Sequence, residues 1–280
     1  MTIKTRAACV IGWPAKHSRS PKLHGYWLKR YGIDGDYRAE EIKPENFATF
    51  VTHLADNGYV GANVTMPHKD MALELSEPDA RATAVAAANT LWLDNGRLRS
   101  TNTDVEGFIG ALDAAAPGWD KRTTSALVLG AGGASRAVVY GLIERGVGEI
   151  VVANRTFDKA VALRDRFGAS VVPVRWEDIA GRLPRCQLVA NTTSLGMKGQ
   201  PPLEIDIAPL PAGAVVADIV YVPLKTPLLK AAEARGLATS NGLEMLLHQA
   251  VRGFELWFGV RPEVTRELYD LLAADIVGAG

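Results

Sequence analysis

The chain has 280 residues, and its 31 basic residues balance 31 acidic ones, so the formal net charge at pH 7 is zero. This balance argues against nucleic acid or a membrane as partner, and 48% hydrophobic with 22% charged residues excludes disordered, collagen-like and coiled-coil proteins. At about 150 residues per domain, the length predicts two domains.

In the first part of the chain, short β-branched runs alternate with helical stretches, as in α/β proteins. Strands are predicted at Ala7–Gly12, Asp36–Ile42, Gly61–Thr65, Asn89–Asp94 and Arg97–Ser100. Helices are predicted from Pro21, from about Pro44 to Asn57, and from a Thr103 cap towards Ala115. Asn95-Gly96 between the last two strands predicts a two-residue hairpin turn.

A second series starts after the break at Ala116-Pro117-Gly118. Its predicted strands are Ser125–Leu129, Glu149–Ala153, Ser170–Val174, Leu188–Asn191 and Val215–Val220. Its predicted helices run from a glycine-rich turn to about Arg145, over Thr156–Phe167 and Gly242–Phe258, and after Pro262. We therefore predict an α/β fold with two lobes, in which the final helices return to the first lobe and the site lies in the cleft between the lobes.

The strongest local motif is the turn Gly130-Ala131-Gly132-Gly133-Ala134, which follows a buried strand and opens a helix. In a dinucleotide-binding turn, such glycines allow a tight bend and bring the backbone close to a pyrophosphate at the helix N-terminus. Ser135 stands where the strict pattern has its third glycine, so an ordinary strand–helix turn is the alternative.

The residues after the next strand indicate which dinucleotide binds. An NAD site usually has an acidic residue there, whereas this chain has Asn154, Arg155 and Thr156, with Lys159 one turn on. The alternative is a solvated pair of cations, but cations at a helix N-terminus oppose the helix dipole. An anionic partner explains them better, so we predict NADP, whose 2′-phosphate Arg155 can bind.

Polar residues also follow the strands of the first lobe. Ser18 and Ser20 precede a helix, Thr65 and Lys69 follow one strand, and Asn89 and Asp104 lie at the ends of others. Each alone has an ordinary explanation, such as a helix cap or a surface lysine. Ligands nevertheless bind at the carboxyl ends of strands in open α/β sheets.

Taken together, these motifs resemble the shikimate dehydrogenase family, from Val10 to about Phe258. The ordered motifs are HSRSP, NVTMPHK, AANT, NTDVEG, GAGGASRA, NRT, DIVYVPLKTPLL and NGLEMLLHQA. The resemblance implies a substrate-binding and catalytic domain of residues 1–104 and 241–280, and a Rossmann-type NADP domain of residues 105–240. It also implies NADP-dependent interconversion of 3-dehydroshikimate and shikimate, a step towards chorismate and the aromatic amino acids.

The resemblance further implies roles for individual residues. Lys69 and Asp104 match the catalytic pair. The residues that match groups holding the substrate are Ser18, Ser20, Thr65, Lys69, Asn89, Asp104, Tyr221 and Gln249. The residues that match cofactor-binding positions are Gly130, Ala131, Gly132, Gly133, Ala134, Asn154, Arg155, Thr156, Lys159, Ile219 and Gly242. The family's acidic cofactor-side position between Lys69 and Asn89 has no clear match here.

The chemistry agrees with these residue types. Reducing a ketone needs a hydride on carbon and a proton on oxygen, and Lys69 can supply the proton while Asp104 orients it. One rival is an NAD-dependent quinate/shikimate dehydrogenase, which the missing acid at Asn154 and the serine at position 20 disfavour. A second is a non-catalytic NADP-binding regulator, which would be expected to lack Lys69 or Asp104.

The remaining expectations concern metals, location and assembly. The five histidines and two cysteines lack metal-ligand spacing, so we expect no metal. No uncharged apolar run reaches the ~18 residues of a membrane span. The N-terminus has no signal-peptide core, so we expect a cytoplasmic protein. The oligomeric state stays open, with a homodimer as one form to consider.

Overall fold

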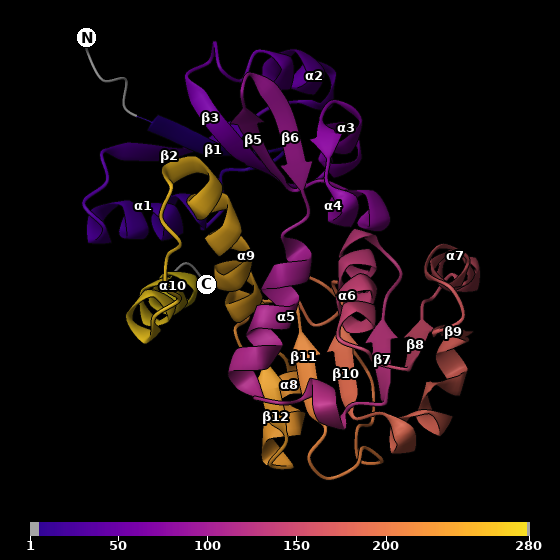
Figure 1. The fold of residues 1–280 in the computed structure, drawn as a ribbon. Helices are drawn as coiled ribbons and strands as arrows, with labels where there is room; N and C mark the ends of the chain where they lie inside the picture. The colour runs from indigo at the N-terminus through magenta and orange to yellow at the C-terminus, as the bar shows by residue number, and fades with distance from the viewer. Residues whose placement is uncertain (1–5, 279–280) are drawn as a thin grey trace. The chain divides into compact units, whose positions relative to one another are not determined.

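Two six-stranded sheets organise the protein, whose computed structural model describes residues 6–278 (Figure 1). The chain divides into two units, each with one sheet. Unit 1 takes in the chain up to Thr103 and residues Gln249–Leu272, and unit 2 takes in Asp104–His248 and the chain from Ala273 onwards.

The sheet of unit 1 is mixed, and its strands lie in the order β2-β1-β3-β5-β6-β4. The strands are β1 (Arg6–Gly12), β2 (Gly35–Glu41), β3 (Tyr59–Val64), β4 (Glu77–Pro78), β5 (Thr90–Asp94) and β6 (Arg97–Thr101). β1 pairs in parallel with β2 and β3, whereas β5 is antiparallel to β3 and β6. Asn95 and Gly96 form the predicted β5–β6 turn with φ of 50° and 78°, the positive values that a type I′ turn requires.

Helices cover this sheet because apolar side chains project from its strands. The helices are α1 (Ser20–Arg30), α2 (Pro44–Thr52), α3 (Lys69–Glu74) and α4 (Ala80–Val85). Phe47 and Val51 of α2 pack with Ile11 of β1 in one core cluster. An aromatic cluster surrounds His24 of α1, whose ring stacks on Tyr37 with centroids 4.0 Å apart. Burial lowers the pKa of His24 to about 3, so the ring is neutral at pH 7.

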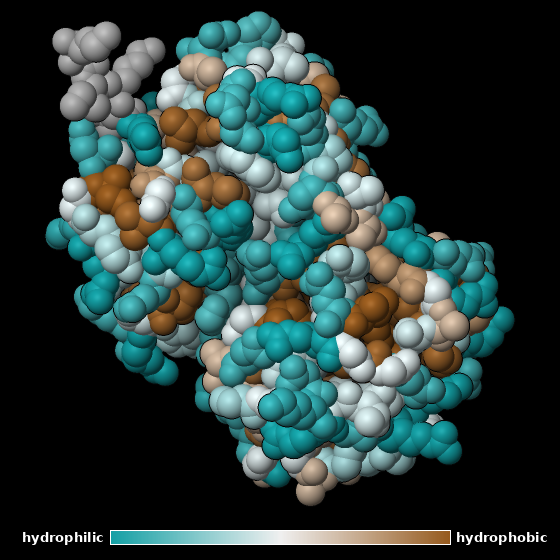
Figure 2. Space-filling model, in the orientation of Figure 1, coloured by the Kyte–Doolittle hydropathy of each residue, from teal (hydrophilic) through white to brown (hydrophobic). Residues whose placement is uncertain are grey.

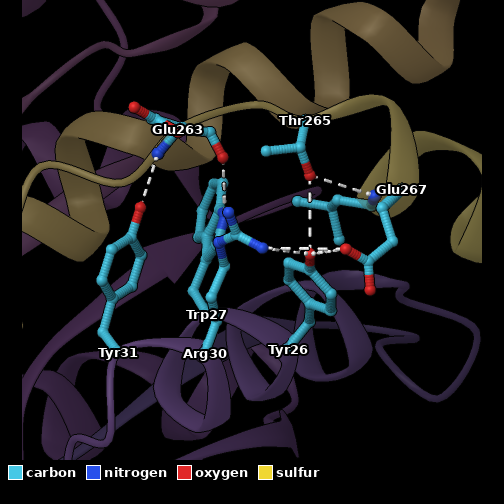
Figure 3. Close-up of polar contacts among 8 residues, drawn as sticks. Tyr26, Trp27, Arg30, Tyr31, Glu263, Thr265 and Glu267 are labelled. Carbon is cyan, nitrogen blue, oxygen red and sulfur yellow. Dashed lines mark hydrogen bonds and ion pairs between the residues drawn. The ribbon is translucent and has the colours of Figure 1, made fainter.

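The C-terminal segment is tied to α1, as Figure 3 shows. The indole N–H of Trp27 donates to the carbonyl of Glu263 at 3.0 Å, and the N–H of Glu263 donates to the Tyr31 hydroxyl at 3.0 Å. The Tyr26 hydroxyl donates to Glu267 at 3.0 Å. These bonds join residues more than 200 positions apart within unit 1, so the segment after α9 (Gly242–Phe258) returns to this unit.

Unit 2 has a parallel sheet in the order β12-β11-β10-β7-β8-β9. The strands are β7 (Ser125–Leu129), β8 (Glu149–Ala153), β9 (Val171–Val174), β10 (Leu188–Asn191), β11 (Val215–Asp218) and β12 (Ala238–Ser240). From the centre of the sheet, β7, β8 and β9 follow one another towards one edge, and β10, β11 and β12 towards the other. This is the doubly wound order of a dinucleotide-binding sheet. The strand order reverses between β7 and β10, and ligands bind outside the carboxyl ends of strands at such a point.

Both faces of this sheet are covered, since the central strands β7, β10 and β11 are buried along their whole length and only the edge strands β9 and β12 are largely half-buried. The helices are α5 (Asp104–Ala115), α6 (Gly133–Glu144), α7 (Phe157–Phe167) and α8 (Pro227–Ala234), with short 3-10 turns η1 (Asp120–Arg122), η2 (Trp176–Gly181) and η3 (Leu183–Arg185). Along β7, Ala126 and Val128 join one core cluster, while Leu127 and Leu129 join the other. This alternation follows the two-residue period of a strand.

Several element boundaries differ from the sequence prediction. The helix predicted to reach Asn57 ends at Thr52, because the chain then makes turns that close at Gly58, with φ of 86°. The strand predicted to reach Val220 ends at Asp218, because that side chain accepts the Val220 N–H that would continue the sheet. Five short elements, α3, α4, α8, β4 and β12, were not predicted from the sequence. The last helix, α10 (Arg266–Gly278), starts four residues after Pro262.

The surface is largely polar on the face that Figure 2 shows, where hydrophobic residues form separate patches. Among the described residues, the large exposed hydrophobic side chains include Trp13 and Met66 of unit 1. Within residues 6–278, none of the helices has the length and apolar character needed to cross a membrane.

A glycine in β3 provides a test of the packing in unit 1. A Cβ atom on Gly61 would lie 2.1 Å from the indole nitrogen of Trp257 and 2.4 Å from the carbonyl oxygen of Leu91. We expect Gly61→Ala to lower the free energy of unfolding by about 1–3 kcal/mol, measured by chemical denaturation.

The matched control is Gly25→Ala on the exposed side of α1, where a Cβ would meet nothing within 4 Å. Since alanine favours the helix, this change is expected to raise stability by about 0.5–1 kcal/mol. Equal effects of the two substitutions would contradict the close packing of β3 against Trp257.

Candidate active site

The buried side chain of Asn89, just before β5, lies at the centre of a polar network in unit 1. Its Oδ1 accepts the backbone N–H of Thr103 at 2.7 Å and the hydroxyl of Thr90 at 3.1 Å. The Thr103 hydroxyl lies 3.2 Å from the same oxygen and 3.3 Å from Oε1 of Gln249, so its proton can serve either. These donors orient the Asn89 amide, with its NH₂ group on the side away from Thr103.

The network continues to the two serines through Tyr37 and Asn63. The Tyr37 hydroxyl donates to Oδ1 of Asn63 at 2.6 Å, and Nδ2 of Asn63 donates to the Thr90 hydroxyl at 3.2 Å. Burial raises the pKa of Tyr37 far above its usual value, and a hydrogen bond with Ser20 opposes this shift. Ser18 Oγ accepts the N–H of Ser20 at 3.2 Å. Ser20, Asn89 and Gln249 thus belong to one connected set.

Lys69 begins α3, and its backbone is anchored on both sides. Its carbonyl accepts the N–H of Ala88 at 3.0 Å. The preceding His68 stacks on Phe47 with centroids 4.4 Å apart, and its Nε2 bonds the Ile42 carbonyl at 2.7 Å. Burial lowers the pKa of His68, which favours the neutral ring that this packing needs. The side chain of Lys69 itself is half-buried.

Asp104 is the first residue of α5 and directly follows Thr103. Asn89 is bonded to Thr103, and the adjacent Ala88 is bonded to the Lys69 carbonyl. The segment Ala88–Asn89 therefore holds the backbone of Lys69 and the backbone just before Asp104, the two residues of the predicted catalytic pair. Thr65 lies immediately after Val64, whose N–H donates to the Asn89 carbonyl at 2.8 Å. The structure therefore brings the predicted substrate residues of unit 1 together around Ala88 and Asn89.

In unit 2 the glycine-rich turn joins β7 to α6. Gly130 has φ of 106°, and a Cβ there would lie 2.7 Å from the Thr192 hydroxyl, so only glycine fits. A Cβ on Gly132, the residue before α6, would meet nothing within 4 Å. The backbone at Gly132 is therefore open to the close approach of a ligand. Ala131, Gly133 and Ala134 complete this turn and the first residues of the helix.

Ser135 stands at the position of the third glycine of the strict motif, and its side chain forms hydrogen bonds within the turn. Its buried hydroxyl oxygen accepts the N–H of Gly132 at 3.0 Å and lies 2.7 Å from the Thr192 hydroxyl. Thr192 in turn donates to the carbonyl of Leu129 at 2.7 Å. The serine at this position therefore stabilises the glycine-rich turn through hydrogen bonds.

The residues after β8 suit the 2′-phosphate of NADP. Asn154 Oδ1 accepts the N–H of Ala131 at 3.2 Å, and its Nδ2 donates to the Thr156 carbonyl at 2.8 Å. Arg155 and Lys159 are exposed, and neither makes an ion pair with any residue of the range 6–278. Two uncompensated cations near the N-terminus of α7, with an amide where a carboxylate would repel phosphate, fit NADP.

The other predicted cofactor positions follow β11. The N–H of Ile219 donates to the Asn191 carbonyl at 3.1 Å, and the N–H of Gly242 donates to the Val220 carbonyl at 3.3 Å. A Cβ on Gly242 would lie 2.1 Å from the carbonyl oxygen of Ile219, so the start of α9 must be glycine. Tyr221, half-buried, is in the same segment.

Sequence reasoning missed several residues that hold these sites. Tyr37 and Asn63 connect Ser20 to Asn89, and Thr192 and Asp218 lie at the strand ends of unit 2. Asn63 and Asp218 are the first residues of two motifs named above, NVTMPHK and DIVYVPLKTPLL, so a signal existed for them. Within the described part of the chain, no group of three His, Cys, Asp or Glu side chains could hold a metal ion.

Comparison with known families matches three segments of the chain. Residues 10–91 match the shikimate dehydrogenase substrate binding domain, and residues 114–197 match the family described as shikimate / quinate 5-dehydrogenase. Residues 242–266 match the shikimate 5′-dehydrogenase C-terminal domain.

Relatives match over nearly the whole chain. A protein named shikimate dehydrogenase (NADP(+)) from Rhodopseudomonas palustris (strain TIE-1) is 66% identical over 276 residues, covering 99% of each chain. One of the same name from Nitrobacter winogradskyi is 65% identical over 279 residues, covering 99% of this chain and 100% of that one. The chain belongs to the shikimate dehydrogenase family. The family predicted from the ordered motifs is therefore confirmed.

Solved structures of the shikimate dehydrogenase family share the fold. Shikimate 5-dehydrogenase from Thermus thermophilus, in complex with NADP(H) and shikimate, is 33% identical with a TM-score of 0.85, covering 97% of this chain and 100% of that one. Quinate dehydrogenase from Corynebacterium glutamicum, in complex with NAD, is 31% identical with a TM-score of 0.87, covering 96% and 99%. The predicted fold class is confirmed.

Arg155 provides a test of the cofactor half of the site. A hydrogen bond to a charged group is worth about 1.5–3 kcal/mol, so Arg155→Ala should raise the KM for NADP roughly 10–150-fold. NAD lacks the 2′-phosphate, so its KM should change only a few-fold, and steady-state kinetics with both cofactors measure the ratio.

Arg164→Ala is the control, because Arg164 lies near the other end of α7 and pairs with Asp165. It should leave both KM values unchanged. If Arg155→Ala weakened NADP and NAD equally, the 2′-phosphate would be recognised elsewhere.

Proposed function

We propose that this chain catalyses the NADP-dependent interconversion of 3-dehydroshikimate and shikimate, with Lys69 and Asp104 as its catalytic pair. The observation that carries the proposal is the hydrogen-bonded set around Ala88 and Asn89, which anchors the backbone at Lys69 and Thr103. The names of the relatives bear out the predicted enzyme class and the choice of NADP. In the pathway to chorismate and the aromatic amino acids, this reaction is one reduction step.

Lys69 moves the proton in this reaction. When bound, NADPH supplies the hydride that reduces the carbonyl carbon. The Nζ of Lys69 donates a proton to the carbonyl oxygen during reduction and takes it back from the hydroxyl during oxidation. Asp104, placed by Thr103, orients the ammonium group and accepts a hydrogen bond from a neighbouring substrate hydroxyl.

The other residues of unit 1 hold the substrate. Ser18 and Ser20 carry hydroxyls that bind the carboxylate as neutral donors. Asn89 offers its NH₂ group to a substrate hydroxyl, because Thr90 and Thr103 already hold its amide oxygen. Thr65 and Gln249, together with Tyr221 of unit 2, are assigned to the remaining hydroxyls and the carboxylate. Unit 1 is thereby assigned to substrate binding.

Unit 2 is assigned to NADP binding. The turn Gly130–Ala134 holds the pyrophosphate, since α6 begins there and the backbone of Gly132 is open. Asn154, Arg155, Thr156 and Lys159 bind the adenosine end. Ile219 and Gly242 line the nicotinamide end. We also place the enzyme in the cytoplasm, with a homodimer as the assembly to test by analytical ultracentrifugation.

Lys69→Ala tests the acid–base assignment. The substitution should lower kcat by about 10²–10⁴-fold, the usual range for a lost general acid–base group. The KM for shikimate should change much less, because the serine, asparagine and glutamine contacts remain. Absorbance at 340 nm with NADP and shikimate gives both constants.

The control is Lys29→Ala, an exposed lysine in the last turn of α1, which should leave kcat unchanged. A Lys69→Ala enzyme with normal kcat would remove Lys69 from the mechanism. A wild-type chain that binds NADP but turns over neither shikimate nor quinate would be the non-catalytic regulator.

Quinate provides a separate test of specificity. It carries an extra hydroxyl on the ring carbon that bears the carboxylate, and the residue proposed to bind that carboxylate, Ser20, is largely buried at 5% exposed. A site whose polar groups lose partners discriminates strongly. Shikimate should therefore be preferred at least about tenfold in kcat/KM, or roughly 1.4 kcal/mol. Comparable efficiencies in the same assay would favour the quinate/shikimate dehydrogenase alternative.

A further inference from the structure

Asp218 is a buried carboxylate to which the proposed mechanism gives no role. It ends β11 and is 2% exposed. Its Oδ1 accepts the side-chain N–H of Asn191 at 3.0 Å and the backbone N–H of Val220 at 3.0 Å. Its Oδ2 accepts the hydroxyl of Thr226 at 2.7 Å. A charge this deeply buried is costly unless donors surround it, so the three bonds are needed to keep it ionised.

The three donors come from three different parts of unit 2. Asn191 ends β10 and pairs directly with Asp218 across the sheet. Thr226 caps α8, where its hydroxyl oxygen accepts the N–H of Leu229 at 3.4 Å. Val220 belongs to the segment Ile219–Tyr221, the only one of the three with no regular secondary structure. The carboxylate therefore ties an irregular segment to a strand and a helix.

This segment reaches the cofactor positions assigned above. Ile219 bonds the Asn191 backbone through its N–H at 3.1 Å, and the Val220 carbonyl accepts the N–H of Gly242 at 3.3 Å. Gly242 leaves no space beside the Ile219 carbonyl, where a Cβ would come within 2.1 Å. A shift of the segment would therefore displace both Ile219 and the start of α9.

We propose that Asp218 is a positioning residue of the reaction: its carboxylate holds the Ile219–Tyr221 segment in the place where the nicotinamide end of NADP binds. This inference rests on the proposed function, because Ile219 and Tyr221 are assigned through it. Asp218 touches neither substrate nor cofactor in this role and acts through the backbone of Val220.

The ionised form is the one that can accept all three bonds. Burial raises the pKa of Asp218 to about 6, and the bonds from Thr226, Val220 and Asn191 oppose that rise. The groups that face the carboxylate from β10, α8 and the segment are these neutral donors. Protonation at lower pH replaces one acceptor with a donor, so the hold on the segment should weaken as the pH falls below about 6.

Calorimetric titration with two ligands separates this role from general stability. NADP⁺ reaches the whole site, whereas adenosine 2′,5′-bisphosphate probes only the adenosine end at Asn154–Lys159. Asp218→Asn keeps the shape but points an NH₂ group at Thr226. It should weaken NADP⁺ about tenfold, the order expected when a hydrogen bond to a charged group is lost. The affinity for the bisphosphate should stay within about twofold, as for a distant site.

Two further variants keep the test decisive. Thr226→Val removes one donor to the carboxylate, so it should weaken NADP⁺ selectively and by less, and it decides the matter should Asp218→Asn not fold. Ser125→Ala is the matched control, because it removes a 2.8 Å hydroxyl–carboxylate bond to Glu149 at the opposite end of the same sheet. It should leave the affinities for both ligands unchanged.

The pH dependence adds a second readout. In the wild type, NADP⁺ binding should fall relative to bisphosphate binding between pH 7 and about 5, and this fall should be absent in Asp218→Asn. The phosphates of each ligand titrate identically whichever protein binds it, so the difference between the wild type and Asp218→Asn isolates the carboxylate of Asp218.

Equal weakening of the two ligands in Asp218→Asn and Thr226→Val, or no weakening of either, would overturn the positioning role. Failure of the proposed function is a different result: the wild type would then bind NADP⁺ without oxidising shikimate.

Discussion

The side-chain oxygen of Asn89 is the acceptor on which unit 1, the proposed substrate-binding unit, depends. It is buried, and a buried amide oxygen without donors would be costly. Thr90 and Thr103 satisfy it, and in doing so they fix the chain just before Asp104 and orient the amide of Asn89 itself. The hydrogen bonds that stabilise this unit are therefore the same ones that orient the proposed substrate-binding amide, so removing Thr103 is expected to affect both.

In unit 2, backbone groups at the carboxyl ends of the parallel strands also need hydrogen-bond partners. Strands β7 and β11 end where a side chain bonds the backbone: the Thr192 hydroxyl donates to the Leu129 carbonyl, and the Asp218 carboxylate accepts the Val220 N–H. Loops that leave such an edge would otherwise be poorly defined. The polar side chains at these strand ends hold the backbone of the segments that are proposed to bind the cofactor. Ser135 holds the glycine-rich turn in the same way, by accepting the N–H of Gly132.

The sequence predicted the long periodic elements well, because buried strands such as Ser125–Leu129 and the helix Gly242–Phe258 have strong patterns over their whole length. It missed α3 and α4, which have six residues each and owe their form to packing and to the Asp79 cap. For the site, motifs supplied the residues that are proposed to meet a ligand. Tyr37 lies in none of these motifs. Asp218 begins the motif DIVYVPLKTPLL but was not singled out, because the importance of both residues lies in partners brought near by the fold.

His24 has a consequence for how the protein responds to acid. An unfolded chain binds a proton at an ordinary histidine pKa of about 6.5, whereas burial holds the pKa of folded His24 at about 3. Between these values the unfolded state binds more protons, so the free energy of unfolding falls as the pH drops through that range. An aromatic cluster that excludes water thus makes unit 1, with its proposed substrate residues, sensitive to acidification well before most carboxylates are protonated.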